Sequence, residues 1–161
     1  MVAAICLFPG AVAAQSTKTI VLVRHAEKIA APPTEPDPEL SPEGRERAQR
    51  LVEAIARRYK PHEIFSTNFK RTRHTAEPIA KKRRKEVQLY DPSNAADLVA
   101  KIMASRTEHY LIVGHSNTIP SLANLLAKKE VFRNLLDNEY GVFWVIRIKN
   151  GVLKKIEVFP Y

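Results

Sequence analysis

The sequence has few of the residues that build covalently or metal-linked scaffolds. It contains a single cysteine, Cys6, among 161 residues. One cysteine can form neither an intramolecular disulfide nor a zinc site of several thiolates, so both kinds of scaffold are excluded. No apolar run reaches the roughly 18 residues that a transmembrane helix needs. With 45% hydrophobic and 27% charged residues, the composition is that of a globular protein, and the length favours a single domain.

Acidic residues are also in the minority. The chain has 26 Lys and Arg against 17 Asp and Glu, a net charge of +9. Residues 70–85 contain eight of these cations and one acid, Glu77, which excludes a histone-like protein with evenly spread charge. Such an excess favours an anionic partner: a phosphorylated substrate, anionic lipid or nucleic acid. The run 81–85 is compatible with a nucleic-acid patch or a solvated helix end. Since no aromatic residue interrupts it, we expect no nucleic-acid partner.

The first 14 residues carry no charge at all. An apolar stretch followed by small residues resembles a signal peptide cleaved near Ala13 or Ala14, although no basic residue precedes it. The alternative is a buried first strand. We expect residues 1–14 to be the remnant of a signal peptide and residues 15–161 to form one domain. The expected location is therefore the bacterial periplasm or the medium, without stable membrane insertion.

Short apolar, β-branched runs alternate with segments of helical periodicity along the rest of the chain. One expected helix begins at Ser41-Pro42, and three more cover residues 71–82, 94–105 and 120–127. The expected strands are residues 19–23, 63–65, 87–90, 110–113, 141–149 and 152–159, the last two forming a hairpin around Asn150-Gly151. This order predicts an α/β fold with three layers, α/β/α, a mostly parallel central sheet and a C-terminal β-hairpin.

Parallel sheets bind ligands at the carboxyl ends of their strands. The residues expected at that edge are Arg24-His25, residues 66–71, Asp91 and Gly114-His115. Imidazole can act as nucleophile, base or metal ligand, and guanidinium presents a planar fork that fits phosphate oxygens. The pattern therefore predicts a phosphoryl-binding edge with a histidine that attacks phosphorus.

Four segments resemble the histidine phosphatase superfamily, whose members are phosphoglycerate-mutase-like. Arg24-His25-Ala26-Glu27 after a strand resembles its signature, and residues 40–44 (LSPEG) resemble its first helix. Residues 70–76 resemble its second arginine motif, with His74 where glutamine is common, and residues 113–117 (VGHSN) resemble its second histidine motif. The four segments occur in order, and the short chain is similar to the exported bacterial branch of the family.

The resemblance implies a role for each matching residue. His25 is the nucleophile, which forms a transient phosphohistidine, while Arg24, Arg71 and His115 bind the phosphoryl oxygens. Asn117 is a candidate for phosphate binding or for capping a helix. The resemblance implies no metal and no cofactor, because the arginines supply the positive charge.

The sequence gives less information about the general acid, the group that protonates the leaving group. Asp91 is the candidate because it is the carboxylate expected at the edge of the sheet, but an Asp before Pro92 also forms turns. Glu27 is a second alternative. The expected function is a phosphatase for phosphate monoesters or phosphoramidates, acting on a phosphorylated small molecule or phosphoprotein. Two alternatives stay open: a phosphoglycerate-mutase-type phosphotransferase, and a non-catalytic module that binds phosphate or polyanions.

Overall fold

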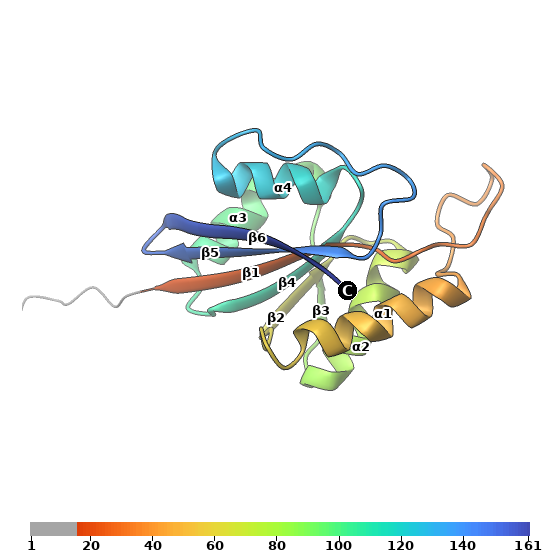
Figure 1. Cartoon of the computed structure of the whole chain (residues 1–161), viewed down its shortest axis with the longest axis horizontal. Helices are drawn as coiled ribbons and strands as arrows, with labels where there is room; N and C mark the ends of the chain where they lie inside the picture. Colours follow the sequence, from red (N-terminus) through yellow and green to blue (C-terminus); the bar gives the residue numbers. More distant parts are fainter. Residues whose placement is uncertain (1–15) are drawn as a thin grey trace, which may run out of the picture.

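A central six-stranded sheet lies between two layers of helices (Figure 1). The computed structural model describes residues 16–161, so the expected signal peptide and Cys6 lie outside the described residues. The strands are β1 (Thr17–Arg24), β2 (Glu63–Ser66), β3 (Val87–Leu89), β4 (His109–Gly114), β5 (Val142–Lys149) and β6 (Val152–Pro160). The helices are α1 (Pro42–Ile55), α2 (Lys70–Arg83), the short 3-10 helix η1 (Pro92–Asn94), α3 (Ala95–Ala104) and α4 (Thr118–Ala127).

The sheet has the strand order β3-β2-β4-β1-β5-β6. The first four strands are parallel, whereas β5 is antiparallel to β1 and β6 is antiparallel to β5. Asn150 and Gly151 join β5 to β6 with φ angles of 51° and 73°, the left-handed conformation that a tight hairpin turn requires. The predicted three-layer α/β/α fold, with its mostly parallel sheet and C-terminal hairpin, is confirmed.

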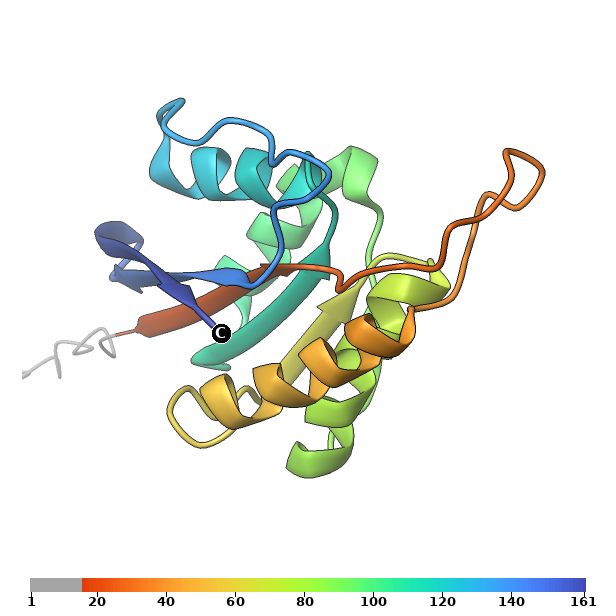
Figure 2. The ribbon, with the colours of Figure 1, turned by 45° about the vertical axis from the view of Figure 1, so that its right-hand side comes forward.

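Alternating side chains of β1 enter two different cores. Val21 and Val23 pack with α1 and α2 on one face of the sheet, and Ile20 and Leu22 pack with α3 and α4 on the other (Figure 2). A strand buried on both faces has the continuous apolar sequence seen here. No helix within residues 16–161 has the length and apolar character needed to cross a membrane.

The loop after β1 is fixed to the start of α1. Ser41 caps this helix, its Oγ accepting a hydrogen bond from the backbone N–H of Gly44 at 3.1 Å. A Cβ at Gly44 would lie 2.1 Å from the carbonyl oxygen of Glu27, so only glycine permits this approach. The segment that follows His25 is thereby fixed against the first turn of α1.

The strand register places the two motif histidines at one edge. Arg24 pairs with Gly114 across β1 and β4, and the His25 N–H donates to the Gly114 carbonyl at 2.9 Å. His25 and His115 therefore leave adjacent parallel strands at the same level. This edge is called the catalytic edge below, and it is where the sequence predicted the site.

Candidate active site

His25 is buried, with 4% of its surface exposed. Its Nδ1 lies 2.7 Å from the carbonyl oxygen of Ala26. Because a carbonyl can only accept, Nδ1 carries the proton and Nε2 keeps its lone pair. Burial lowers the pKa of His25 to about 3, although the Ala26 hydrogen bond opposes this shift, and the charges of His115, Arg71 and Arg24 lower it further. The imidazole is therefore neutral at neutral pH, as a nucleophile must be.

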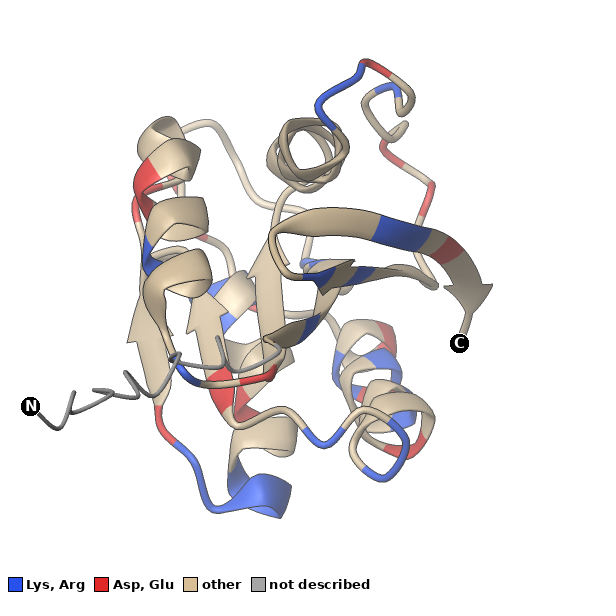
Figure 3. Ribbon diagram, turned by 90° about the vertical axis from the view of Figure 1, so that its left-hand side faces the viewer, with Lys and Arg blue, Asp and Glu red and all other residues tan. Residues whose placement is uncertain are grey.

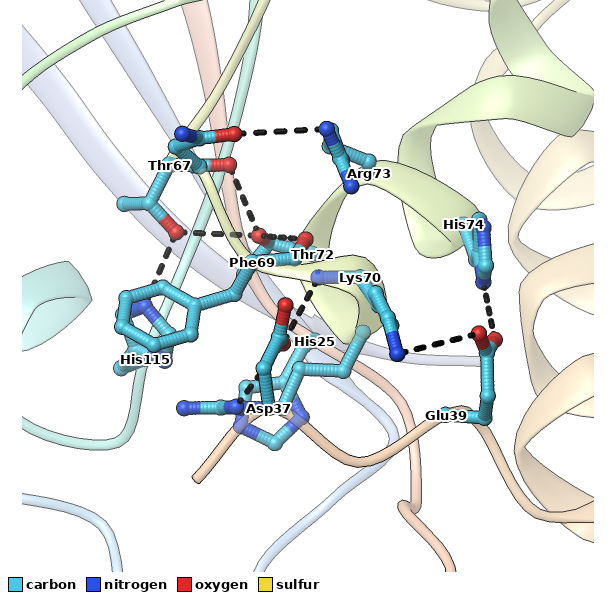
Figure 4. Close-up of polar contacts among 12 residues, drawn as sticks. His25, Asp37, Glu39, Thr67, Phe69, Lys70, Thr72, Arg73, His74 and His115 are labelled. Carbon is cyan, nitrogen blue, oxygen red and sulfur yellow. Dashed lines mark hydrogen bonds and ion pairs between the residues drawn. The ribbon is translucent and has the colours of Figure 1, made fainter. Parts of the chain in front are cut away.

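His115 lies beside His25, with 5.4 Å between the ring centroids. Its Nε2 is 2.9 Å from Oγ1 of Thr67, which fixes the orientation of the ring (Figure 4). Burial lowers the pKa of His115 to about 4, and the charges of Arg71 and Arg24 add to the effect. Both imidazoles are thus kept uncharged beside two cationic side chains.

Arg24 is buried beneath the segment between α4 and β5. Its Nη1 donates to the carbonyls of Leu136 and Glu139 at 2.7 and 2.8 Å, and its guanidinium lies 4.0 Å from the centre of the Tyr140 ring. The Nε of Arg24 is buried and has no hydrogen-bond partner within the described part of the chain. The long segment 128–141 therefore positions this arginine and leaves one donor unused.

Asn124 of α4 holds that segment in place. Its Nδ2 donates to the Phe132 carbonyl at 2.8 Å, and its Oδ1 accepts from the N–H groups of Val131 and Phe132 at 2.9 and 2.8 Å. The side chain is itself buried, so its hydrogen-bonding groups must be satisfied by the protein. Asn124 thus links α4 to the segment that surrounds Arg24.

Arg71 approaches the histidines from the first turn of α2. Its guanidinium lies 4.4 Å from the centre of the Phe69 ring, and its Nη1 lies 3.6 Å from Oδ1 of Asp37. Nε and Nη1 are buried and make no hydrogen bond to the residues described. Buried guanidinium donors normally have partners, so the unused donors of Arg24 and Arg71 favour an anion beside the two histidines.

Two carboxylates of the proline loop (residues 31–40) reach the catalytic edge. Asp37 accepts a hydrogen bond from the backbone N–H of Lys70 at 2.9 Å, and Glu39 lies 2.7 Å from Nδ1 of His74 (Figure 4). Phe69 stands at the N-cap of α2 and cannot cap it, so Asp37 takes that function from a distant loop. Residues 31–40 have no helical or strand periodicity, so the sequence does not indicate which acid reaches α2.

None of the hydrogen bonds found for the other predicted site residues, among the residues described, involves His25 or His115. Asp91 accepts from the N–H and Oγ of Ser93 at 2.8 and 2.7 Å and is exposed. None of its hydrogen bonds involves the catalytic edge, so its role as acid stays a prediction without a supporting contact. The exposed side chain of Asn117 makes no capping hydrogen bond, and its phosphate role also stays a prediction. Glu27 accepts both its short hydrogen bonds from Arg47.

The fold and this arrangement define an α/β protein of the phosphoglycerate-mutase-like class. A mycobacterial glucosyl-3-phosphoglycerate phosphatase has a TM-score of 0.68 at 15% identity, covering 90% of this chain and 98% of its own. SixA of Agrobacterium tumefaciens, described as a phosphohistidine phosphatase, gives 0.65 at 20% identity over 87% and 97%. Phosphoserine phosphatase of Entamoeba histolytica gives 0.66 at 17% over 86% and 96%.

These similarities show a shared fold. Residues 20–92 match the family model described as histidine phosphatase superfamily (branch 1). No curated protein matches the chain. The matched range contains Arg24, His25 and Arg71, whereas His115 lies beyond it.

The lowered pKa of His25 predicts a loss of stability in acid. The unfolded imidazole has a pKa near 6.5 and the folded one about 3, so between these values the unfolded chain binds more protons. The free energy of unfolding should therefore fall as the pH drops below 6.5, by up to about 1.4 kcal/mol per pH unit for this group. Denaturant titrations between pH 7 and pH 4 give the free energy of unfolding at each pH. Its slope against pH should be shallower for His25→Asn than for the wild type. His62→Asn, at an exposed position, should retain most of the wild-type slope. Equal slopes for wild type and His25→Asn would contradict the assignment.

Proposed function

We propose that this protein is a phosphatase that hydrolyses phosphate monoesters or phosphoramidates through a covalent phosphohistidine on His25. One observation carries the proposal: the Nδ1–H of His25 is bound to the Ala26 carbonyl, which leaves Nε2 unprotonated beside two arginines with unused donors. The structures of similar fold include proteins named as phosphatases, which supports the same reaction class.

In the first step Nε2 of His25 attacks phosphorus, and the bond from phosphorus to the leaving oxygen or nitrogen breaks. The leaving atom takes the bonding pair and a proton. In the second step water attacks the phosphohistidine, the P–N bond breaks, and inorganic phosphate leaves as the water proton passes to a base. Guanidinium groups of Arg24 and Arg71 offset the charge on the transferring phosphoryl group in both steps.

Asp37 is better placed than Asp91 to deliver the proton. Its Oδ1 lies 3.6 Å from Nη1 of Arg71, whose Nε and Nη1 make no hydrogen bond to the residues described, whereas Asp91 is bound to Ser93. We therefore propose Asp37 as the group that protonates the leaving atom and then accepts the proton of water.

Acid-quench labelling tests the proposal directly. With a radiolabelled aryl phosphate, the full chain should release inorganic phosphate and carry label that is stable in alkali and lost in acid, the behaviour of a phosphoramidate. A phosphoglycerate should yield phosphate rather than its isomer, which separates the phosphatase from the mutase alternative. Tight phosphate binding with no turnover of any phosphorylated substrate would instead identify a binding module and overturn the proposal.

A further inference from the structure

Eight cationic side chains gather at the end of the molecule opposite the catalytic edge. They lie in the segment that follows α1 and in the last turn of α2 with the residues after it: Arg57, Arg58, Lys60, Lys81, Lys82, Arg83, Arg84 and Lys85. None of the ion pairs found among residues 16–161 involves any of the eight. Figure 3 faces the end of the sheet where the parallel strands begin and shows the run 81–85 at the end of α2. We call these eight residues the basic surface.

The topology separates this surface from the histidines. Helix α2 begins with Lys70 and Arg71 at the catalytic edge and has 14 residues. At 1.5 Å per residue, its other end lies about 20 Å away. The charges of the basic surface therefore cannot contact a phosphoryl group held by His25 and Arg71.

The fold itself does not require so much charge of one sign. Arg83 donates to the Pro61 carbonyl at 3.4 Å, and Arg58 lies over the Tyr59 and Phe159 rings, so these two contribute to packing. Cations in the last turn of α2 also suit the negative end of the helix dipole. Neither reason applies to Arg57, Lys60 or Lys85, and like charges this close repel one another. A cluster of this kind is stabilised when an anionic partner binds it.

We infer that the basic surface binds an anionic phospholipid membrane. Clusters of four to eight Lys and Arg are the feature by which proteins adsorb to anionic lipid headgroups. No aromatic side chain belongs to the cluster, so it offers no platform on which bases of single-stranded nucleic acid could stack. Its residues lie on two helix ends and a loop, with no protruding helix or ribbon to enter a DNA groove.

The start of the described chain lies at the same end. Thr17 opens β1, and the register aligns the beginning of β1 with that of β4, of β4 with β2, and of β2 with β3, which directly follows the run 81–85. The basic surface therefore shares the end of the molecule at which the parallel strands begin.

The position of the basic surface sets the orientation of the docked protein. It lies at the opposite end of α2 from the catalytic edge, so a membrane bound to it faces away from His25. The docked protein would hold its catalytic edge away from the bilayer. Substrates would then arrive from the aqueous phase, and lipid headgroups of the same membrane would stay out of reach.

Vesicle sedimentation with the full chain tests this inference. The wild type should bind vesicles containing about 30% phosphatidylglycerol and bind poorly to pure phosphatidylcholine, and raising the salt to about 0.5 M should release it. The triple variant K81Q/K82Q/K85Q removes three exposed charges without touching Arg58 or Arg83. Its partition coefficient should fall by on the order of a hundredfold.

A second triple variant provides the matched control. R45Q/R50Q/K129Q removes the same total charge from exposed positions outside the basic surface and should change the partition coefficient less than about threefold. An equal loss in both variants would show a response to net charge and would overturn the inference. So would equal binding of the wild type to neutral vesicles, or binding to DNA with none to anionic vesicles.

Discussion

Replacing His25 with Asn should lower kcat for an aryl phosphate by about 10⁴-fold or more, while the protein stays folded. The amide Nδ2 of Asn can take the place of Nδ1 and donate to the Ala26 carbonyl, so the local hydrogen bond is kept. What Asn lacks is the unprotonated Nε2 that would form the bond to phosphorus. The variant should also carry no acid-labile phosphoryl label, because no other nucleophile replaces the imidazole.

His62→Asn is the matched control for that change. His62 is exposed, and its ring centroid lies 5.7 Å from that of His109 at the start of β4, far from the catalytic edge. Its replacement should leave kcat within about twofold of the wild type, as expected for an exposed residue without a partner in the reaction. If His25→Asn retained turnover and label, the covalent mechanism would be wrong, and a water molecule activated at the arginines would be the simplest replacement.

Replacing Asp37 with Asn should lower kcat/KM for substrates with poor leaving groups far more than for substrates with good ones. Asn can still accept the Lys70 N–H hydrogen bond that caps α2, but it cannot give a proton. Alkyl phosphates have poor leaving groups, so their kcat/KM should fall by about 10²- to 10³-fold, the range expected for loss of a general acid. Aryl phosphates and phosphoramidates leave without much help and should change less than about fivefold.

Asp91→Asn distinguishes the two candidate acids. Asn also caps the turn at Ser93, so the fold of η1 should persist, and all three substrate classes should keep their wild-type rates. A loss confined to alkyl phosphates in Asp91→Asn would return the acid role to that residue. An equal loss for all substrates in Asp37→Asn would instead mean that Asp37 only positions Arg71 and α2.

The sequence by itself determined the fold class and most of the catalytic edge. Strand and helix periodicities are local, and the Asn150-Gly151 pair specifies its turn through backbone preferences alone. Parallel strands separated by helices bring their carboxyl ends to one edge, so the positions of Arg24, His25 and His115 followed from their place directly after apolar runs. The basic run 81–85 was equally visible, but a linear sequence cannot show that Arg57, Arg58 and Lys60 join it.

Only the tertiary structure decided what each of these groups contacts. Arg24 donates to carbonyls more than a hundred residues away, and Asp37 rather than Asp91 reaches the catalytic edge. These contacts depend on how long loops without periodicity fold back, which no local pattern encodes. The lowered pKa values of His25 and His115 likewise come first from burial, a property of the packed molecule. The residue types were therefore set along the chain, whereas the orientation of His25 and the contacts of Asp37 and Asp91 depend on packing.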